Sequence, residues 1–105
     1  MTEFICVQVA CESNEQAQTI ASALVAEQLA ACVQLTEVAS VYRWQGEVER
    51  AAECVLQIKT RASLFERISA RVIELHSYEV PEIIGLPILS ISESYATWLD
   101  QNCVK

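Results

Sequence analysis

One short run, from His76 to Glu82, gathers the side chains best able to do chemistry: the chain's single histidine, a tyrosine and two glutamates. Imidazole and carboxylate together suit Cu(II), Zn(II) or Ni(II), whereas oxygen ligands alone suit Mg²⁺ or Ca²⁺. We expect a helix to end near His76 and Pro81 to keep the following segment extended. That arrangement can direct His76, Glu79 and Glu82 toward one pocket. The alternative is that His76 only caps the helix C-terminus, where the dipole favours a cation or donor.

The cysteines offer a second kind of metal ligand. There are five of them, an odd number without a C-x-x-C pair, and we expect no signal peptide before them, so a reducing cytosol fits best. Cys11, at the end of the first expected strand, is a candidate thiolate ligand for copper or zinc. The alternative is that Cys11 is a buried small hydrophobe. Nothing in the sequence places Cys11 beside His76, so a histidine-activated nucleophile is not indicated.

A cluster of aromatic and cationic side chains precedes the turn at Gln45-Gly46. Tyr42, Arg43 and Trp44 are residue types enriched at interface hot spots, and the tip of a hairpin is an unusual place for them unless something covers it. We interpret these three residues as a subunit interface, with a lid over a ligand as the alternative. Trp98, near the C-terminus, is a further candidate interface residue.

Composition narrows the class of protein. We expect the 105 residues to form one domain, 1–105. Hydrophobic residues make up 52% of the chain and its mean hydropathy is +0.25, a high apolar content for a small domain. This content favours a surface covered by partner subunits. A net charge of −7 repels a phosphate backbone, so nucleic-acid binding is not expected. The same charge attracts cations. No apolar run approaches the roughly 20 residues of a membrane-spanning helix, so membrane insertion is not expected either.

Hydrophobic periodicity predicts a mixed α+β fold. Apolar, β-branched patterns typical of strands occupy residues 3–11, 32–44, 48–60 and 83–91. Helical patterns occupy residues 13 to about 31, 63–76 and 92–102. The order β-α-β-β-α-β, followed by a short C-terminal helix, is that of the ferredoxin-like split β-α-β fold, with an antiparallel sheet and both main helices on one face.

Local signals set the expected ends of these elements. Ser13 with Gln16, and Ser63 with Glu66, match the capping box that begins a helix. The first helix is expected to bury its apolar face as far as Val25. Two strands as long as 32–44 and 48–60 form a hairpin that projects beyond a globule of this size, and such a tip is marginal in water unless a neighbouring subunit supports it.

The sequence resembles the CutA family of divalent-ion tolerance proteins over about residues 7–99. The resemblance rests on runs that follow the family's order: Ala-Ala-Cys-Val at 30–33, Ser-Val-Tyr-Arg-Trp-Gln-Gly at 40–46, Ile-Lys-Thr-Arg at 58–61, His-Ser-Tyr-Glu-Val-Pro-Glu-Ile at 76–83 and Tyr-Ala-Thr-Trp-Leu at 95–99. The resemblance implies a homotrimer related to the PII signalling proteins, in which long strands pair between subunits. It also implies binding of copper and other divalent ions, a cytoplasmic location in bacteria, and no established enzymatic activity.

Family metal ligands carry over onto His76 and Glu82, with Glu79 as a neighbour that can join. The family's cysteine ligand aligns with Val9, whereas the nearest thiol here is Cys11, two residues further along on the same strand face. Ser77 and Glu47 also differ from the residues usual in the family, which are proline and lysine.

Three functions are compatible with these features. The first is a trimeric cytoplasmic protein that binds copper(II), or zinc, in metal tolerance. The alternative is a PII-like sensor or scaffold that binds a small ligand or a protein, with metal binding incidental. The third, a hydrolase that uses Glu79 or Glu82 as a base with a metal-bound water, lacks an identifiable nucleophile or substrate pocket.

Overall fold

Regular structure follows the expected order along residues 3–105, the part of the chain that the computed structural model describes. The elements are β1 (Phe4–Cys11), α1 (Asn14–Ala26), β2 (Cys32–Trp44), β3 (Glu47–Arg61), the 3₁₀ turn η1 (Ala62–Leu64), α2 (Phe65–Leu75), β4 (Ile83–Pro87) and α3 (Glu93–Gln101). The strands form one sheet in the order β2-β3-β1-β4, and all neighbours are antiparallel. Because β3 lies between β1 and β2, the predicted α+β, ferredoxin-like split β-α-β fold is confirmed.

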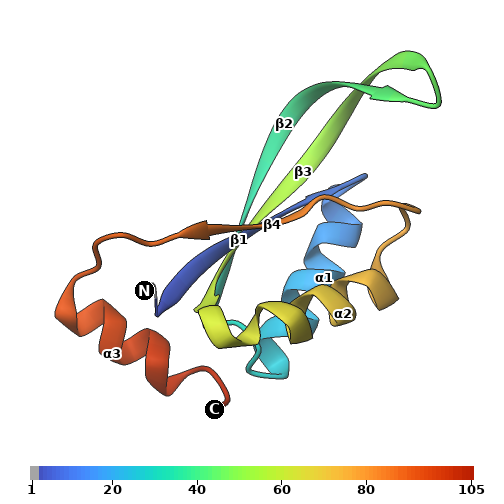
Figure 1. The fold of residues 1–105 in the computed structure, drawn as a ribbon. Helices are drawn as coiled ribbons and strands as arrows, with labels where there is room; N and C mark the ends of the chain where they lie inside the picture. Colours follow the sequence, from blue (N-terminus) through green and yellow to red (C-terminus); the bar gives the residue numbers. More distant parts are fainter. Residues whose placement is uncertain (1–2) are drawn as a thin grey trace.

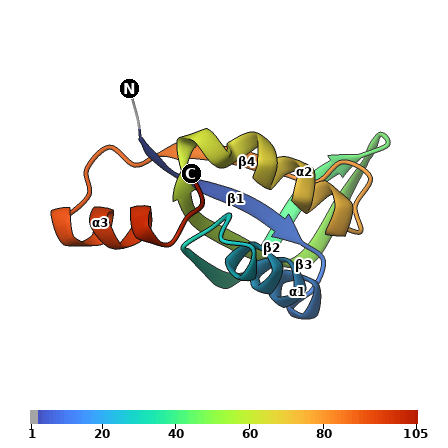
Figure 2. The same ribbon diagram turned by 90° about the horizontal axis from the view of Figure 1, so that it is seen from below.

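Helices α1 and α2 cover one face of the sheet (Figure 1), and Figure 2 shows them on either side of β1 when the sheet is viewed from below. The sheet residues that face them alternate along each strand, as a pleated strand requires. Fully enclosed side chains of this core are Val7 and Val9 of β1, Leu56 and Ile58 of β3, Ile20 and Leu24 of α1, Ile68 and Val72 of α2, and Leu99 of α3. The core therefore lies between the sheet and its helices.

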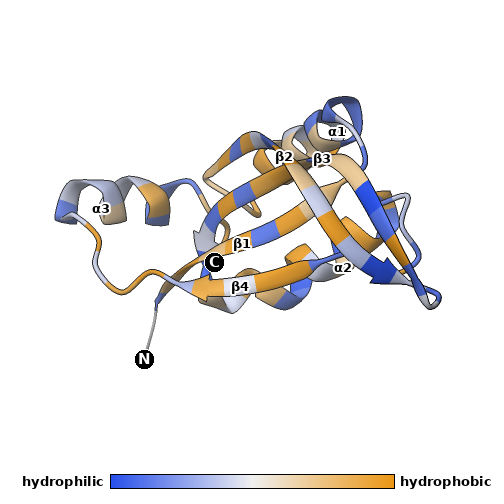
Figure 3. Cartoon of the chain, turned by 90° about the horizontal axis from the view of Figure 1, so that it is seen from above, coloured by the Kyte–Doolittle hydropathy of each residue, from blue (hydrophilic) through white to orange (hydrophobic). Residues whose placement is uncertain are grey.

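The opposite face of the sheet has no described helix over it (Figure 3). Edge strand β4 appears there as an apolar strip, and its outward-facing Ile84 and Leu86 are exposed. Pro87, which has no N–H to donate, lies on this edge strand, where a missing donor is tolerated. No described helix is long and apolar enough to span a bilayer.

The hairpin of β2 and β3 extends beyond the rest of the sheet, as predicted. β1 pairs with β3 only as far as Cys54, so residues 38–44 and 47–53 pair only with each other. We call residues 38–53 the hairpin arm. Its turn places Gln45 at φ 50° and Gly46 at φ 83°, the pair of positive angles that a two-residue hairpin turn needs. The arm at one end and α3 at the other (Figure 2) give the chain its elongated dimensions of 45 × 25 × 22 Å.

Helix α1 ends at Ala26, five residues before the predicted end near residue 31. Gln28 adopts the left-handed conformation, with φ 57°. The N–H groups of Gln28 and Leu29 then donate to the carbonyl oxygens of Val25 and Leu24. This is a Schellman motif, in which a left-handed residue satisfies the last carbonyl groups of a helix. Val25, predicted to be buried, is exposed on this last turn.

Two other boundaries differ from the prediction. The Ser63–Glu66 capping box does not form, because a 3₁₀ turn precedes α2 and its N-cap residue is Leu64, which makes no side-chain capping bond. The Ser13 cap is confirmed, since Ser13 Oγ accepts from the Gln16 N–H at 3.1 Å. The last strand ends at Pro87 and not at residue 91.

Replacing Gln28 by glycine tests the left-handed cap. A non-glycine residue in this conformation costs about 1–2 kcal/mol, and glycine's larger loss of backbone entropy offsets roughly 0.5–1 kcal/mol of that. We therefore expect Gln28→Gly to raise the free energy of unfolding by about 0.5–1 kcal/mol in urea titrations at fixed protein concentration. The matched change Gln18→Gly, inside α1, should lower it by about 1 kcal/mol. Destabilisation by Gln28→Gly would contradict the assignment.

Candidate functional site

The segment that follows α2 carries most of the predicted site residues. His76 is the C-cap residue of α2, and its backbone N–H donates to the carbonyl oxygen of Val72 at 2.8 Å. From there the chain runs without regular structure to β4, which it enters at Ile83. The predicted position of His76 at the helix end is therefore confirmed.

Both ring nitrogens of His76 already have hydrogen-bond partners. Nε2 lies 2.7 Å from the carbonyl oxygen of Ala10, and Nδ1 accepts from the backbone N–H of Tyr78 at 3.0 Å. A carbonyl oxygen can only accept, so this network assigns the neutral imidazole with its proton on Nε2. β4 pairs with β1 only as far as Val9. The imidazole binds the next residue of that strand edge, Ala10, through its carbonyl oxygen. His76 can bind a metal only if one of these two bonds breaks.

Tyr78 connects the same segment to β3. Its hydroxyl donates to Glu53 Oε2 at 2.7 Å, and the Glu53 residue is only 8% exposed. Burial and the hydrogen bond to Glu53 raise the pKa of the Tyr78 phenol well above its ordinary value. The Tyr78 ring also lies 4.9 Å from the imidazole, centre to centre. Two contacts, one to β1 and one to β3, therefore hold residues 76–78 against the sheet.

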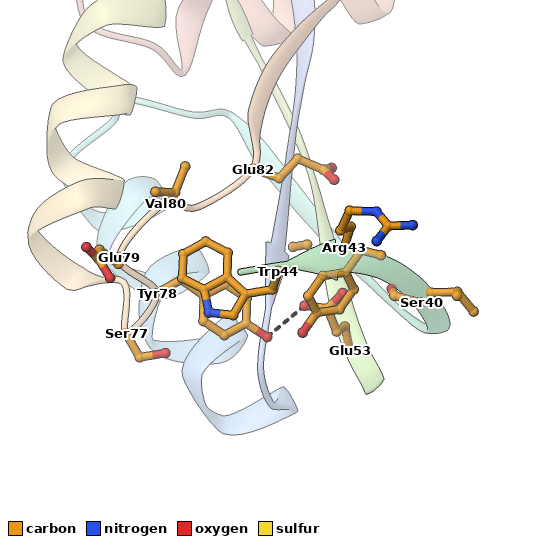
Figure 4. Close-up of a pocket in the computed structure, with 12 residues that line it drawn as sticks. Ser40, Arg43, Trp44, Glu53, Ser77, Tyr78, Glu79, Val80 and Glu82 are labelled. Carbon is orange, nitrogen blue, oxygen red and sulfur yellow. Dashed lines mark hydrogen bonds between the residues drawn. The ribbon is translucent and has the colours of Figure 1, made fainter. Parts of the chain in front are cut away.

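A cavity of about 850 Å³ lies between this segment and the hairpin arm. The aromatic residues Tyr42, Trp44 and Tyr78 line it, together with the charged residues Arg43, Glu53, Glu79 and Glu82. Figure 4 shows Glu79 and Glu82 on opposite sides of the Trp44 and Tyr78 rings, with Glu82 and Glu53 on the same side as Arg43. A cavity of this size, with aromatic walls and a few polar groups, is typical of small-ligand sites.

The two carboxylates predicted as ligands have different surroundings. Glu82 Oε2 accepts from Gln8 Nε2 of β1 at 3.0 Å, so its side chain is directed along the sheet. Glu79 is exposed at the mouth of the cavity. Both are accessible to a cation from solvent.

Cys11 does not join the other predicted ligands. Its side chain is fully buried and is not among the residues that line the cavity. Burial, with smaller contributions from Cys54, Glu53 and Glu12, raises the pKa of the Cys11 thiol to about 12. A neutral, enclosed thiol does not suit metal binding, which needs the thiolate. The buried small hydrophobe, the alternative in the sequence analysis, describes Cys11 better.

Within residues 3–105, no three histidine, cysteine, aspartate or glutamate side chains lie close enough to hold one metal ion. The predicted set of His76, Glu79, Glu82 and Cys11 is thus not assembled by a single chain. Sequence reasoning missed Glu53 and Gln8, which hold Tyr78 and Glu82. The signal for Glu53 was present, since a lone charge interrupts the apolar run from Ala51 to Leu56.

Trp98, predicted at an interface, lies on α3 and does not line the cavity. It stays exposed beside Tyr95, with ring centres 5.4 Å apart. An exposed pair of aromatic rings remains available for contact with another molecule.

Replacing Tyr78 by phenylalanine tests the contact with Glu53. Loss of the hydroxyl leaves the buried Glu53 without this donor, so we expect the free energy of unfolding to fall by about 1–3 kcal/mol at neutral pH. The pKa of Tyr78 is higher in the folded protein than its value near 10 in the unfolded chain, so the protonated phenol stabilises the fold fully below pH 10. That contribution is lost as the pH rises from the unfolded pKa toward the folded pKa. Urea titrations from pH 7 to 11 should show wild-type stability falling more steeply above pH 10 than that of Tyr78→Phe. Parallel curves would contradict the contact.

Comparisons with known proteins identify the family. Residues 5–102 match the family described as CutA1 divalent ion tolerance protein. A divalent-cation tolerance protein CutA from Thermus thermophilus is 46% identical over 97 residues, covering 91% of this chain and 94% of the relative. A chloroplastic CutA from Arabidopsis thaliana is 43% identical over 99 residues, covering 93% of this chain but 54% of that longer protein.

Solved structures agree with the sequence match. The crystal structure of CutA1 from Oryza sativa has a TM-score of 0.95 at 37% identity, covering 99% of this chain and 96% of that chain. The Thermus thermophilus protein has a TM-score of 0.92 at 44% identity, covering 96% and 99%. The chain therefore belongs to the CutA1 divalent ion tolerance family.

Proposed function

We propose that this protein is a cytoplasmic homotrimer that binds divalent cations, copper(II) foremost, at sites completed between subunits, and that it acts by binding and not by catalysis. The observation that carries the proposal is the placement of Glu79 and Glu82 on a cavity beside an uncovered hairpin arm. Membership of a family named for divalent-ion tolerance supports the choice of ligand.

Exposed apolar surface supports the trimer. Val41 and Val48 of the hairpin arm are 60% and 55% exposed, and Tyr42 and Trp44 are also exposed. The arm is a two-stranded ribbon, and no third strand or helix among the elements of residues 3–105 pairs with it. Such a ribbon is marginal in water, so a neighbouring subunit is the natural cover for it. The predicted interface residues Tyr42, Arg43 and Trp44 all lie on this arm.

The carboxylates support a cation site shared between subunits. Glu79 and Glu82 face solvent, and the chain carries a net charge of −7, which attracts cations. The described residues of one chain offer no set of three ligands, so groups from a second chain would complete the shell. His76 positions the segment that carries both carboxylates. Direct ligation by its imidazole stays a prediction that requires the bond to Ala10 or to Tyr78 to break.

Copper(II) is the proposed ion because it leads the affinity order of the divalent first-row metals at nitrogen and oxygen sites. Zinc is the second choice, because imidazole and carboxylate ligands also suit it. Free, unpaired thiols at all five cysteines support a reducing compartment such as the cytoplasm.

The cavity also supports a second function, a PII-like sensor that binds a small ligand with metal binding incidental. Its 850 Å³ volume can hold a ligand of ordinary size, and its aromatic walls are not needed for a metal ion. A small molecule that raises the melting temperature in the presence of a chelator would favour this function over the first.

Removing single carboxylates tests the cation site. We expect Glu82→Gln and Glu79→Gln each to weaken copper(II) binding by about tenfold in isothermal titration, because each removes one charged oxygen ligand. Glu66→Gln removes the same charge at the far end of α2 and should leave the affinity unchanged. Equal affinities in all four proteins would contradict the site.

A charge on the hairpin arm tests the trimer. Light scattering of the wild type should give three times the chain mass of 11.7 kDa. Val41→Asp and Val48→Asp should shift the mass toward that of one chain, because a carboxylate buried without a partner opposes association. Ile73→Asp places the same charge on an exposed position of α2 and should leave the mass unchanged. A wild-type mass of one chain would refute the trimer.

A further inference from the structure

Two buried thiols face each other where the hairpin arm leaves the sheet. Cys11 is the last residue of β1 and lies directly opposite Cys54 of β3 in the antiparallel register. Both cysteines are free, and both belong to the hydrophobic core. Beyond this rung β3 pairs only with β2, so the Cys11–Cys54 pair is the last connection between the arm and β1.

The geometry of this pair suits a covalent bond. Residues directly opposed in an antiparallel ladder point to the same face and have Cα atoms about 4.5–5.5 Å apart, within the range of about 4.4–6.8 Å found in disulfides. The amide of Asn14, at the start of α1, lies 3.9 Å from Cys54 Sγ, which places that sulfur on the helix side of the sheet. Cys11 shares this face because it is the paired residue.

No other pair of cysteines in residues 3–105 is opposed in this way. Cys6 and Cys32 both face Lys59, one from each side, so β3 separates them. Cys103 follows α3 near the C-terminus. Bond formation within one chain is therefore specific to Cys11 and Cys54.

We propose that Cys11 and Cys54 form a reversible cross-strand disulfide when a small disulfide such as oxidised glutathione is present. When fraying of the last rung admits water to the pair, one cysteine loses its proton to water. Its thiolate then attacks the glutathione disulfide, which gives a mixed disulfide and releases one glutathione thiol. The second cysteine attacks the protein sulfur of the mixed disulfide, and the second glutathione thiol leaves. In total, two protein thiols lose two electrons and two protons, and one oxidised glutathione becomes two thiols.

The position of the pair explains how an oxidant reaches the thiols and what the bond would do to the hairpin arm. Cys11 ends its strand, so fraying of a single rung exposes the thiols without unfolding the core. Its neighbour Ala10 accepts the hydrogen bond from His76, and the neighbour of Cys54, Glu53, accepts that from Tyr78. A bond between the two sulfurs therefore fixes the base of the hairpin arm and the two attachment points of the cavity wall.

Thiol counting tests the proposal. The purified full chain is equilibrated with oxidised glutathione, quenched with acid, unfolded and treated with iodoacetamide. We expect alkylation of three of the five cysteines, an unalkylated mass lower by two hydrogen atoms, and a peptide that links residues 11 and 54. Hydrogen exchange at residues 53–56 should also slow, because the last rung can no longer fray.

Two variants make the result specific. Cys32→Ser should still lose two thiols on oxidation without gaining mass from glutathione, whereas Cys54→Ser should form no bond within the chain and at most one mixed disulfide with glutathione, at Cys11. Five alkylated cysteines in the treated wild type would overturn the proposal, as would a stable mixed disulfide with glutathione or a bond between other cysteines. Protection of Cys11 and Cys54 by added copper(I), without the loss of two hydrogen atoms, would assign the pair to metal binding and would overturn it too.

Discussion

The imidazole of His76 connects the end of α2 to the edge of β1, and the position of the cavity wall depends on that connection. β4 stops pairing with β1 at Val9, so the edge of the sheet at Ala10 needs a donor from elsewhere. His76 supplies this donor through Nε2 and accepts the Tyr78 N–H through Nδ1. One ring thus sets the direction in which the chain leaves the helix. The positions of Tyr78 and Glu82 beside the cavity depend on that direction.

The exposed apolar surface of the hairpin arm is the second constraint on the molecule, because it bears on whether chains associate. A ribbon of two strands buries little apolar surface by itself, yet this one carries Val41, Tyr42, Trp44 and Val48 in exposed positions. Surface of this kind is usually covered in the working form of a protein. Residues of the arm form one wall of the cavity, so a subunit that covered the arm would also border the cavity. The Cys11–Cys54 rung lies where the two meet.

Much of the fold was predictable because long apolar patterns report burial directly. β2 was predicted with its observed bounds, and the order of the elements led to the correct class. The missed boundaries depend on contacts that a local pattern does not contain. Gln28 ends α1 in a left-handed conformation usually taken by glycine, and Leu64 begins α2 through a 3₁₀ turn in place of the Ser63 cap.

The candidate site was predictable in position but not in arrangement. The cavity is lined by residues from the run 76–82, which was selected as a metal site. It is also lined by residues 42–44, which were selected as an interface with a ligand lid as the alternative. The hydrogen-bond partners of His76 and Tyr78 could not be predicted. Ala10 offers only a backbone carbonyl, which no residue type reveals, and Glu53 lies on a strand distant in sequence. The role of His76 is the central claim, and nitrogen NMR of the single histidine tests it most directly. In the metal-free protein we predict a proton on Nε2 and an unprotonated Nδ1 that accepts a hydrogen bond; a proton on Nδ1, or on both ring nitrogens, would contradict this account.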